Sequence, residues 1–155
     1  MGFDTSAGPL FGTGGAGTTF ALRLRAGVQA GRYVALAIQS TTFFIADEGR
    51  VLSSGVGVLL EHAAMLHVTP VNALDLGIGA AVDVGTPRGS AGSGTDESRD
   101  RLMFALTARV AANIGRTNPA TGKRVAFTFG VCPHLVFAPA GAVLVLTAGP
   151  GAEWF

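Results

Sequence analysis

The chain is short of charged residues, of lysine and of cysteine. Asp, Glu, Lys and Arg make up only 14% of its 155 residues, whereas an ordinary soluble domain has about 25%. Much of the surface is therefore expected not to face water. The net charge is +1 and the cationic residues, with Lys123 as the single lysine, form no cluster. Nucleic acid is thus not expected as a partner, because neutralising phosphates requires clustered cations. The lone Cys132 excludes an internal disulfide and a multi-cysteine metal site.

The start of the chain also lacks the basic and apolar segments of a secretory signal peptide. We expect that such a signal has been removed; the alternative is a protein that stays in the cytosol. From Val125 to Ala152 no Asp, Glu, Lys or Arg occurs, and this run is long enough for a transmembrane helix. Pro133, Pro139 and Pro150 interrupt it, so two strands around a turn are expected instead.

What the sequence does contain is a two-residue alternation, clearest between Val71 and Val84. One face is apolar, with Leu76 and Ile78, and the other consists of Gly and Ala beside Asp75 and Asp83. This period is that of a β-strand. A sheet facing water would carry Thr, Lys or Glu on its second face. Small residues with scattered charges instead favour the narrow lumen of a barrel whose outside contacts lipid.

Gly, Pro and Asn residues divide the chain into eight apolar segments. These are 2–11, 18–29, 33–44, 56–68, 72–84, 101–112, 124–137 and 142–155. We predict a single domain over 1–155, all-β, folded as an eight-stranded antiparallel up-and-down transmembrane β-barrel. The loops 12–17, 45–54 and 85–99 then lie at one end, and 113–123 is a long connection at the other unless a longer hairpin runs through it. Helices are the alternative for 56–68 and 98–115, which keeps a soluble α+β domain open.

Charged residues follow the same alternation in the other segments. Arg23 and Arg25 share a face with Ala21 and Gly27 and not with the neighbouring leucines. Placing an Arg on the lipid face costs about 2–4 kcal/mol at mid-membrane, so these side chains are expected to point inward. The alternative is ordinary solvent-facing charge on a soluble sheet. The predicted lumen charge network consists of Arg23, Arg25, Glu61, Asp75, Asp83, Arg109 and Arg124.

The alternating segments, the glycine-rich inner face and the ending AVLVLTAGPGAEWF resemble the small outer-membrane β-barrels of Gram-negative bacteria. The resemblance covers most of the chain as a pattern and not as a sequence signature. It implies an outer-membrane location. It also implies that Phe155, with Trp154, belongs to the C-terminal signal read by the barrel-assembly machinery, and that Trp154 suits an interfacial aromatic girdle. The chain departs from the family pattern because Tyr33 and Trp154 are its only Tyr and Trp.

Catalytic and metal-binding motifs are sparse. His62, His67 and His134 are the only histidines available for a His-Ser-acid arrangement. Adjacent Glu61 and His62 point to opposite faces of a strand, and no serine stands in a nucleophile motif such as GxSxG. His62 and His67 also fall on opposite faces, which disfavours a metal site between them. We therefore expect no enzyme activity, no cofactor and no metal.

The function expected from this pattern is structural, adhesive or surface-interacting, with a lumen filled by side chains and not an open pore. The expected partners are the lipid bilayer, the assembly machinery, and a surface partner that contacts loops 45–54 and 85–100. Two alternatives stay open. A soluble lipocalin-like barrel would place Leu74, Leu76 and Phe127 inside around an apolar ligand. A barrel enzyme acting on lipids would depend on His67 or His134.

Overall fold

The computed structural model describes residues 1–31, 33–46, 56–71, 74–87, 101–117, 124–138 and 141–154. Every regular element among them is a strand. The strands are β1 (Gly2–Gly12), β2 (Gly15–Gln29), β3 (Val34–Ala46), β4 (Val56–Val71), β5 (Leu74–Pro87), β6 (Arg101–Thr117), β7 (Arg124–Ala138) and β8 (Gly141–Trp154). The described residues contain no apolar helix of membrane-spanning length.

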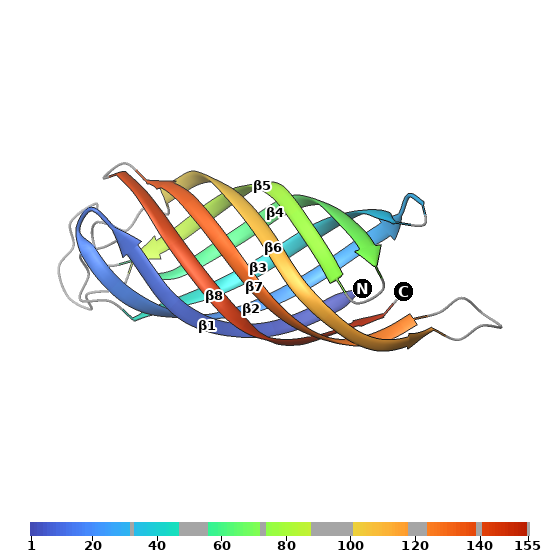
Figure 1. Cartoon of the computed structure of the whole chain (residues 1–155). Coiled ribbons are helices and arrows are strands. Elements are labelled where there is room, and N and C mark those ends of the chain that lie inside the picture. The colour runs from blue at the N-terminus through green and yellow to red at the C-terminus, as the bar shows by residue number, and fades with distance from the viewer. Residues whose placement is uncertain are drawn as a thin grey trace.

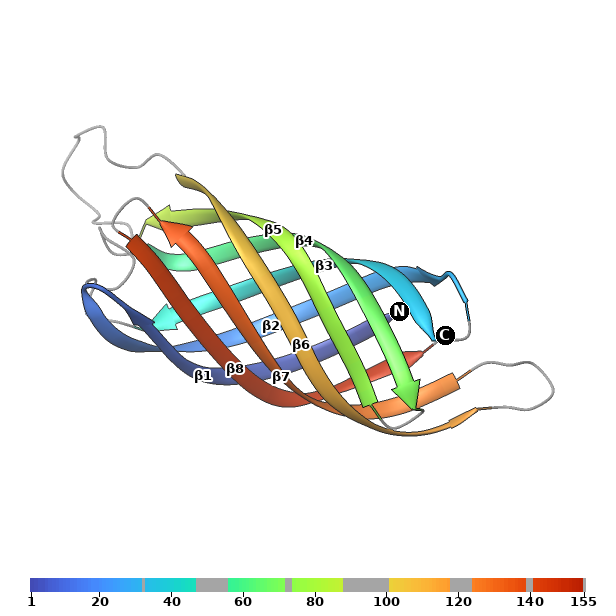
Figure 2. The same ribbon diagram turned by 45° about the horizontal axis from the view of Figure 1, so that its top comes forward.

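The strands form one closed barrel in which each pairs antiparallel with its neighbour in sequence, and β1 pairs with β8. Figures 1 and 2 show the strands tilted along an elongated barrel, with both chain ends at the same end of it. We call this the terminal end and the opposite one the distal end. The amino group of Met1 donates a hydrogen bond to the carbonyl oxygen of Trp154 at 2.6 Å, which ties the two chain ends together. The predicted all-β, eight-stranded up-and-down barrel is confirmed.

The helical alternative is wrong for both segments that it covered. Residues 56–68 lie within β4, and 101–115 lie within β6; residues 98–100 lie outside the described part. The expected long connection 113–123 is also shorter, because β6 continues to Thr117 and β7 begins at Arg124. A helix would bury one stripe, whereas closure buries every second residue of each strand.

The glycine-rich loop expected over 12–17 is mostly strand. Gly12 pairs with Gly15, so only Thr13 and Gly14 connect β1 to β2. Gly15 has a φ of +135°, a backbone conformation that favours glycine. A run of Gly and Ala shows no alternation between apolar and polar side chains. The sequence pattern therefore did not reveal that β1 and β2 extend to this end of the hairpin.

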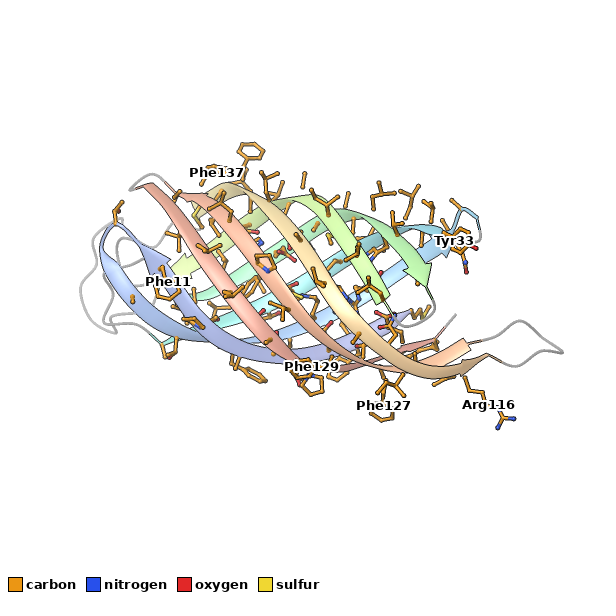
Figure 3. All side chains as sticks on the ribbon, in the orientation of Figure 1. Phe11, Tyr33, Arg116, Phe127, Phe129 and Phe137 are labelled. Carbon is orange, nitrogen blue, oxygen red and sulfur yellow. The ribbon has the colours of Figure 1, made fainter. Side chains whose placement is uncertain are left out.

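The two faces of the wall have opposite character. Ile78 is 65% exposed and Phe127 is 74% exposed on the outside, whereas Asp75 and Asp83 are buried inside, at 4% and 0%. Figure 3 shows Phe127 and Phe137 projecting away from the barrel wall. This is the reverse of a soluble domain, in which large apolar side chains are buried and carboxylates are mostly exposed.

Toward the distal end the lumen is filled by apolar side chains, which we call the apolar cap. Larger members such as Phe43, Leu59 and Val136 are almost fully buried. The alternation indicated small residues and scattered charges on the inner face, and it did not indicate this group of larger apolar side chains. The cap comprises Leu10, Ala21, Phe43, Ile45, Leu59, Met103, Ala105, Val136, Val143 and Val145. Three further buried apolar residues, Ala63, Met65 and Ala81, lie on the terminal side of Glu61 and Asp83.

Candidate functional site in the barrel lumen

Buried polar side chains occupy the rest of the lumen in two groups. The arginine cluster lies toward the terminal end and consists of Asp4, Arg23, Arg25, His67, Asp75, Arg109 and Glu153. The histidine cluster lies between it and the apolar cap and consists of Gln39, Thr41, Glu61, Asp83 and His134. Each member is at least nine-tenths buried.

Arg109 is the centre of the arginine cluster. Its guanidinium lies 3.1 Å from carboxylate oxygens of Asp4, of Asp75 and of Glu153, which come from three different strands. A planar guanidinium with five donors can address several carboxylates at once, which an ammonium cannot do in fixed geometry. Arg109 therefore connects β6 to β1, β5 and β8 across the lumen.

Two further arginines complete this cluster from β2. Arg23 lies 2.6 Å from Asp4, its direct partner in the β1–β2 register. Arg25 lies 3.1 Å from Asp4 and 2.8 Å from Glu153. The three guanidinium groups thus face three carboxylates, counting Asp75, and their formal charges cancel. Burial of these ions is tolerated because each is paired.

A glycine on β7 provides the space that Arg109 needs. A Cβ built at Gly130 would lie 2.9 Å from Nη1 of Arg109. Real side-chain carbons avoid such a distance, so a larger residue there displaces the guanidinium. The small residues of the inner face are therefore matched to the long side chains that cross the lumen.

In the histidine cluster, one imidazole lies between two carboxylates. Nε2 of His134 lies 2.7 Å from Oδ2 of Asp83, and Nδ1 lies 2.7 Å from Oε2 of Glu61. Glu61 and Asp83 are direct partners in the β4–β5 register. The imidazole stacks on the ring of Phe43, with centroids 5.1 Å apart. The ring is thereby held between β3, β4, β5 and β7.

The other oxygen of Glu61 is fixed by two donors from β3. Nε2 of Gln39 and Oγ1 of Thr41 donate hydrogen bonds to Oε1 of Glu61 at 2.8 Å and 2.7 Å. Among the described side chains, no Arg or Lys forms an ion pair with Glu61 or Asp83. The histidine cluster therefore has an excess of negative charge, in contrast to the arginine cluster.

The structure divides the predicted charge network between these clusters. Arg23, Arg25, Asp75 and Arg109 lie in the arginine cluster, and Glu61 and Asp83 lie in the histidine cluster. The side chain of Arg124 lies outside the described part. Sequence reasoning missed Asp4 and Glu153, which lie in the first and last strands, where the alternation is weakest. It also placed no partner beside His134.

A separate polar pair lies on the outer face. Oγ of Ser40 and Nδ1 of His62 are 3.2 Å apart on neighbouring strands β3 and β4. The alternation places His62 outside, as the structure does, but gave no sign of this serine partner. No carboxylate in the described part of the chain forms an ion pair with His62, so the pair lacks the acid of a His-Ser-acid arrangement.

The chain matches no known family of sequences and no curated protein sequence. Among solved structures it is similar to the crystal structure of Neisserial surface protein A (NspA), with a TM-score of 0.59 and 12% sequence identity. The match covers 97% of this chain and 92% of that one. An identity this low supports the fold and nothing finer. The chain thus has the fold of the small eight-stranded outer-membrane β-barrels.

Proposed function

We propose that this protein is a small outer-membrane β-barrel with a structural, adhesive or surface-interaction role. The observation that carries the proposal is the orientation of the wall: large apolar side chains cover the outside, while buried charges lie inside. A bilayer is the solvent in which this arrangement is stable. The strands have 11 to 17 residues, and about 9–11 tilted residues suffice to cross the hydrocarbon layer.

The filled lumen favours a structural scaffold over a channel. The apolar cap closes its distal half, and bulky side chains such as Arg23 and Arg109 fill the rest at almost complete burial. Eight-stranded barrels are just wide enough for side chains to fill them. Surface recognition is then assigned to the distal connections, predicted as 45–54 and 85–100, of which 47–54 and 88–100 lie outside the described residues.

The proposed partners are the bilayer and, during biogenesis, the barrel-assembly machinery. Trp154 lies exposed at the terminal end of β8, where an interfacial aromatic residue is stabilised by headgroups. Phe155 lies outside the described residues, and its role in the C-terminal assembly signal stays part of the proposal.

The two alternatives require arrangements that the described residues do not favour. A lipocalin-like carrier needs Leu76 and Phe127 inside, but both are exposed. A lipid-acting enzyme needs a serine nucleophile activated by a histidine and an acid. His67 and His134 instead contact carboxylates, Asp75 for the former and Glu61 with Asp83 for the latter.

Fractionation and gel migration test the proposal. The protein is expressed behind a secretory signal in a Gram-negative host, and its envelope is separated by density. We expect it in the outer-membrane fraction, extracted only with detergent, with a faster band before boiling than after. Recovery in plain buffer as a monomer, with one band at both temperatures, would contradict the proposal and favour the carrier.

A further inference from the structure

The histidine cluster differs from the arginine cluster in one respect, which is that its negative charge is not matched by guanidinium groups. Glu61 and Asp83 are both almost fully inaccessible to water, and no described Arg or Lys pairs with either. With a neutral imidazole at His134, the cluster carries two negative charges. Leaving such charge unmatched in a dry lumen is costly, and a divalent cation would neutralise it fully.

Each of the three residues also has one buried atom without a hydrogen-bond partner. These atoms are Oε2 of Glu61, Oδ1 of Asp83 and Nδ1 of His134. Nδ1 and Oε2 approach to 2.7 Å, yet their relative orientation is not that of a hydrogen bond. Nε2 of His134 contacts Oδ2 of Asp83. If the single proton of a neutral imidazole lies on Nε2, the lone pair of Nδ1 faces the carboxylate of Glu61. Two acceptors this close need a cation between them, which is either a second proton on the imidazole or a metal ion.

We propose that Glu61, Asp83 and His134 form a binding site for a divalent transition-metal ion, with Zn²⁺ the best match. One imidazole nitrogen and two carboxylate oxygens are a donor set that Zn²⁺, Mn²⁺ and Fe²⁺ accept. One potential ligand atom from each residue lies within 4.8 Å of the others. A three-residue set leaves a further coordination position for water.

The surroundings orient these donors as they do in metal sites. Gln39 and Thr41 hold one oxygen of Glu61, which leaves Oε2 for the ion. Phe43 fixes the plane of the imidazole, and such outer contacts set ligand direction. Typical Zn–N and Zn–O distances of about 2.0–2.2 Å place two ligands roughly 3.3 Å apart. Binding would therefore widen the 2.7 Å contact between His134 and Glu61 by a few tenths of an ångström. It would also draw together the more distant ligand atoms, which lie up to 4.8 Å apart.

A metal here would join β4, β5 and β7 beneath the apolar cap. Because the cap lies on one side and the arginine cluster on the other, the ion would enter while the barrel closes and exchange slowly afterwards. The proposal adds a ligand class to the scaffold role and does not depend on which surface partner the loops contact.

Metal content of the untagged wild-type protein is the first test. The barrel is extracted from membranes without unfolding and analysed by elemental mass spectrometry, and a second sample is refolded in detergent with EDTA. We expect about one Zn²⁺ per chain in the extracted protein, retained in EDTA until the protein is unfolded. The metal-free barrel should melt at a lower temperature, and Zn²⁺ added during refolding should restore the melting temperature. Only traces of metal, with equal melting temperatures, would overturn the site and assign the charge compensation to a proton on His134.

Cobalt substitution tests the ligands. Refolding with Co²⁺ should give the visible absorption of a low-coordinate Co²⁺ site with nitrogen and oxygen ligands, and Asp83→Asn and Glu61→Gln should each abolish it. Asp75→Asn is the matched control, because it removes a buried carboxylate of the arginine cluster, and it should keep the band. A band that survives Asp83→Asn, or no band in wild type, would overturn the assignment. These results are independent of outer-membrane location, so failure here leaves the scaffold proposal untouched.

Discussion

At the scale of single residues, the side of the wall on which a residue lies determines which substitutions it tolerates. Ile78 and Ala81 lie on the same strand, β5, with Ile78 outside and Ala81 inside. Ile78→Arg should destabilise the membrane-inserted barrel by about 2–4 kcal/mol if it lies near mid-membrane, whereas Ala81→Ser should cost about 1 kcal/mol for its buried hydroxyl. The measurement is the folded fraction on gels after refolding into vesicles. Equal effects of the two substitutions would contradict the assigned faces.

Residue size on the inner face is equally constrained. Gly130→Ala should destabilise the barrel by about 1–3 kcal/mol, because the added carbon displaces a guanidinium that three carboxylates hold. Gly31→Ala is the control, since a Cβ there meets nothing within 4 Å. Urea unfolding in micelles measures both. If Gly130→Ala is as stable as Gly31→Ala, Arg109 does not cross the lumen as described.

The alternation of single residues predicted the faces of the wall well. Ile78, Phe127 and Asp83 each lie on the side that their parity indicated. The apolar cap was not predicted, although Leu59 shares its parity with Glu61, and Val136 shares its parity with His134. The alternation therefore does place these apolar residues on the inner face. It does not indicate that they gather at one end of the lumen.

At the scale of elements, backbone hydrogen bonds join neighbouring strands, and ion pairs between side chains join strands across the lumen. Arg109→Met should destabilise the barrel by about 3–5 kcal/mol, because it leaves buried carboxylates without their common partner. Arg109→Lys should recover only part of this loss. The control is Arg116→Met, an exposed arginine near the end of the same strand, which Figure 3 shows pointing away from the barrel.

Urea unfolding in micelles, analysed by linear extrapolation, gives these free energies. A wild-type midpoint for Arg109→Met would mean that the ions of the arginine cluster do not stabilise the closed barrel. The same experiment on Arg116→Met reports the cost of removing a charge that faces solvent at the terminal end, which we expect to be within about 0.5 kcal/mol.

The strand pattern could be predicted from the sequence, but the clusters could not. The strand ends in the structure differ from the predicted ends by a few residues, as at Gly15 and Thr117. Small or polar residues at these ends show no clear alternation. Asp4 meets Arg109 although 105 residues separate them. Their contact depends on barrel closure and on the stagger between strands. Neither can be predicted from the alternation of residues along a single strand. Parity alone therefore predicts that a charge points inward but not which charge it meets.

At the scale of the whole molecule, the filled lumen predicts an electrically silent barrel. Purified protein inserted into a planar bilayer should give no discrete conductance steps, because the apolar cap closes the distal half of the lumen. A lipid-inserted preparation that migrates as folded on a gel serves as the positive control for insertion. Reproducible ohmic steps from that preparation would contradict the description of a closed lumen.

Spin-label accessibility along β5 tests the orientation of the wall most directly. With buried Cys132 replaced by Ser, single cysteines are placed at the outward-facing Leu76, Ile78 and Ala80 of β5. A cysteine at Gly31, where an added Cβ meets nothing within 4 Å, is the aqueous reference. In vesicles, the labels on β5 should collide with dissolved oxygen and not with a water-soluble nickel complex, whereas the label at Gly31 should collide with the nickel complex. Nickel accessibility at position 78 equal to that of a free aqueous label would contradict the account.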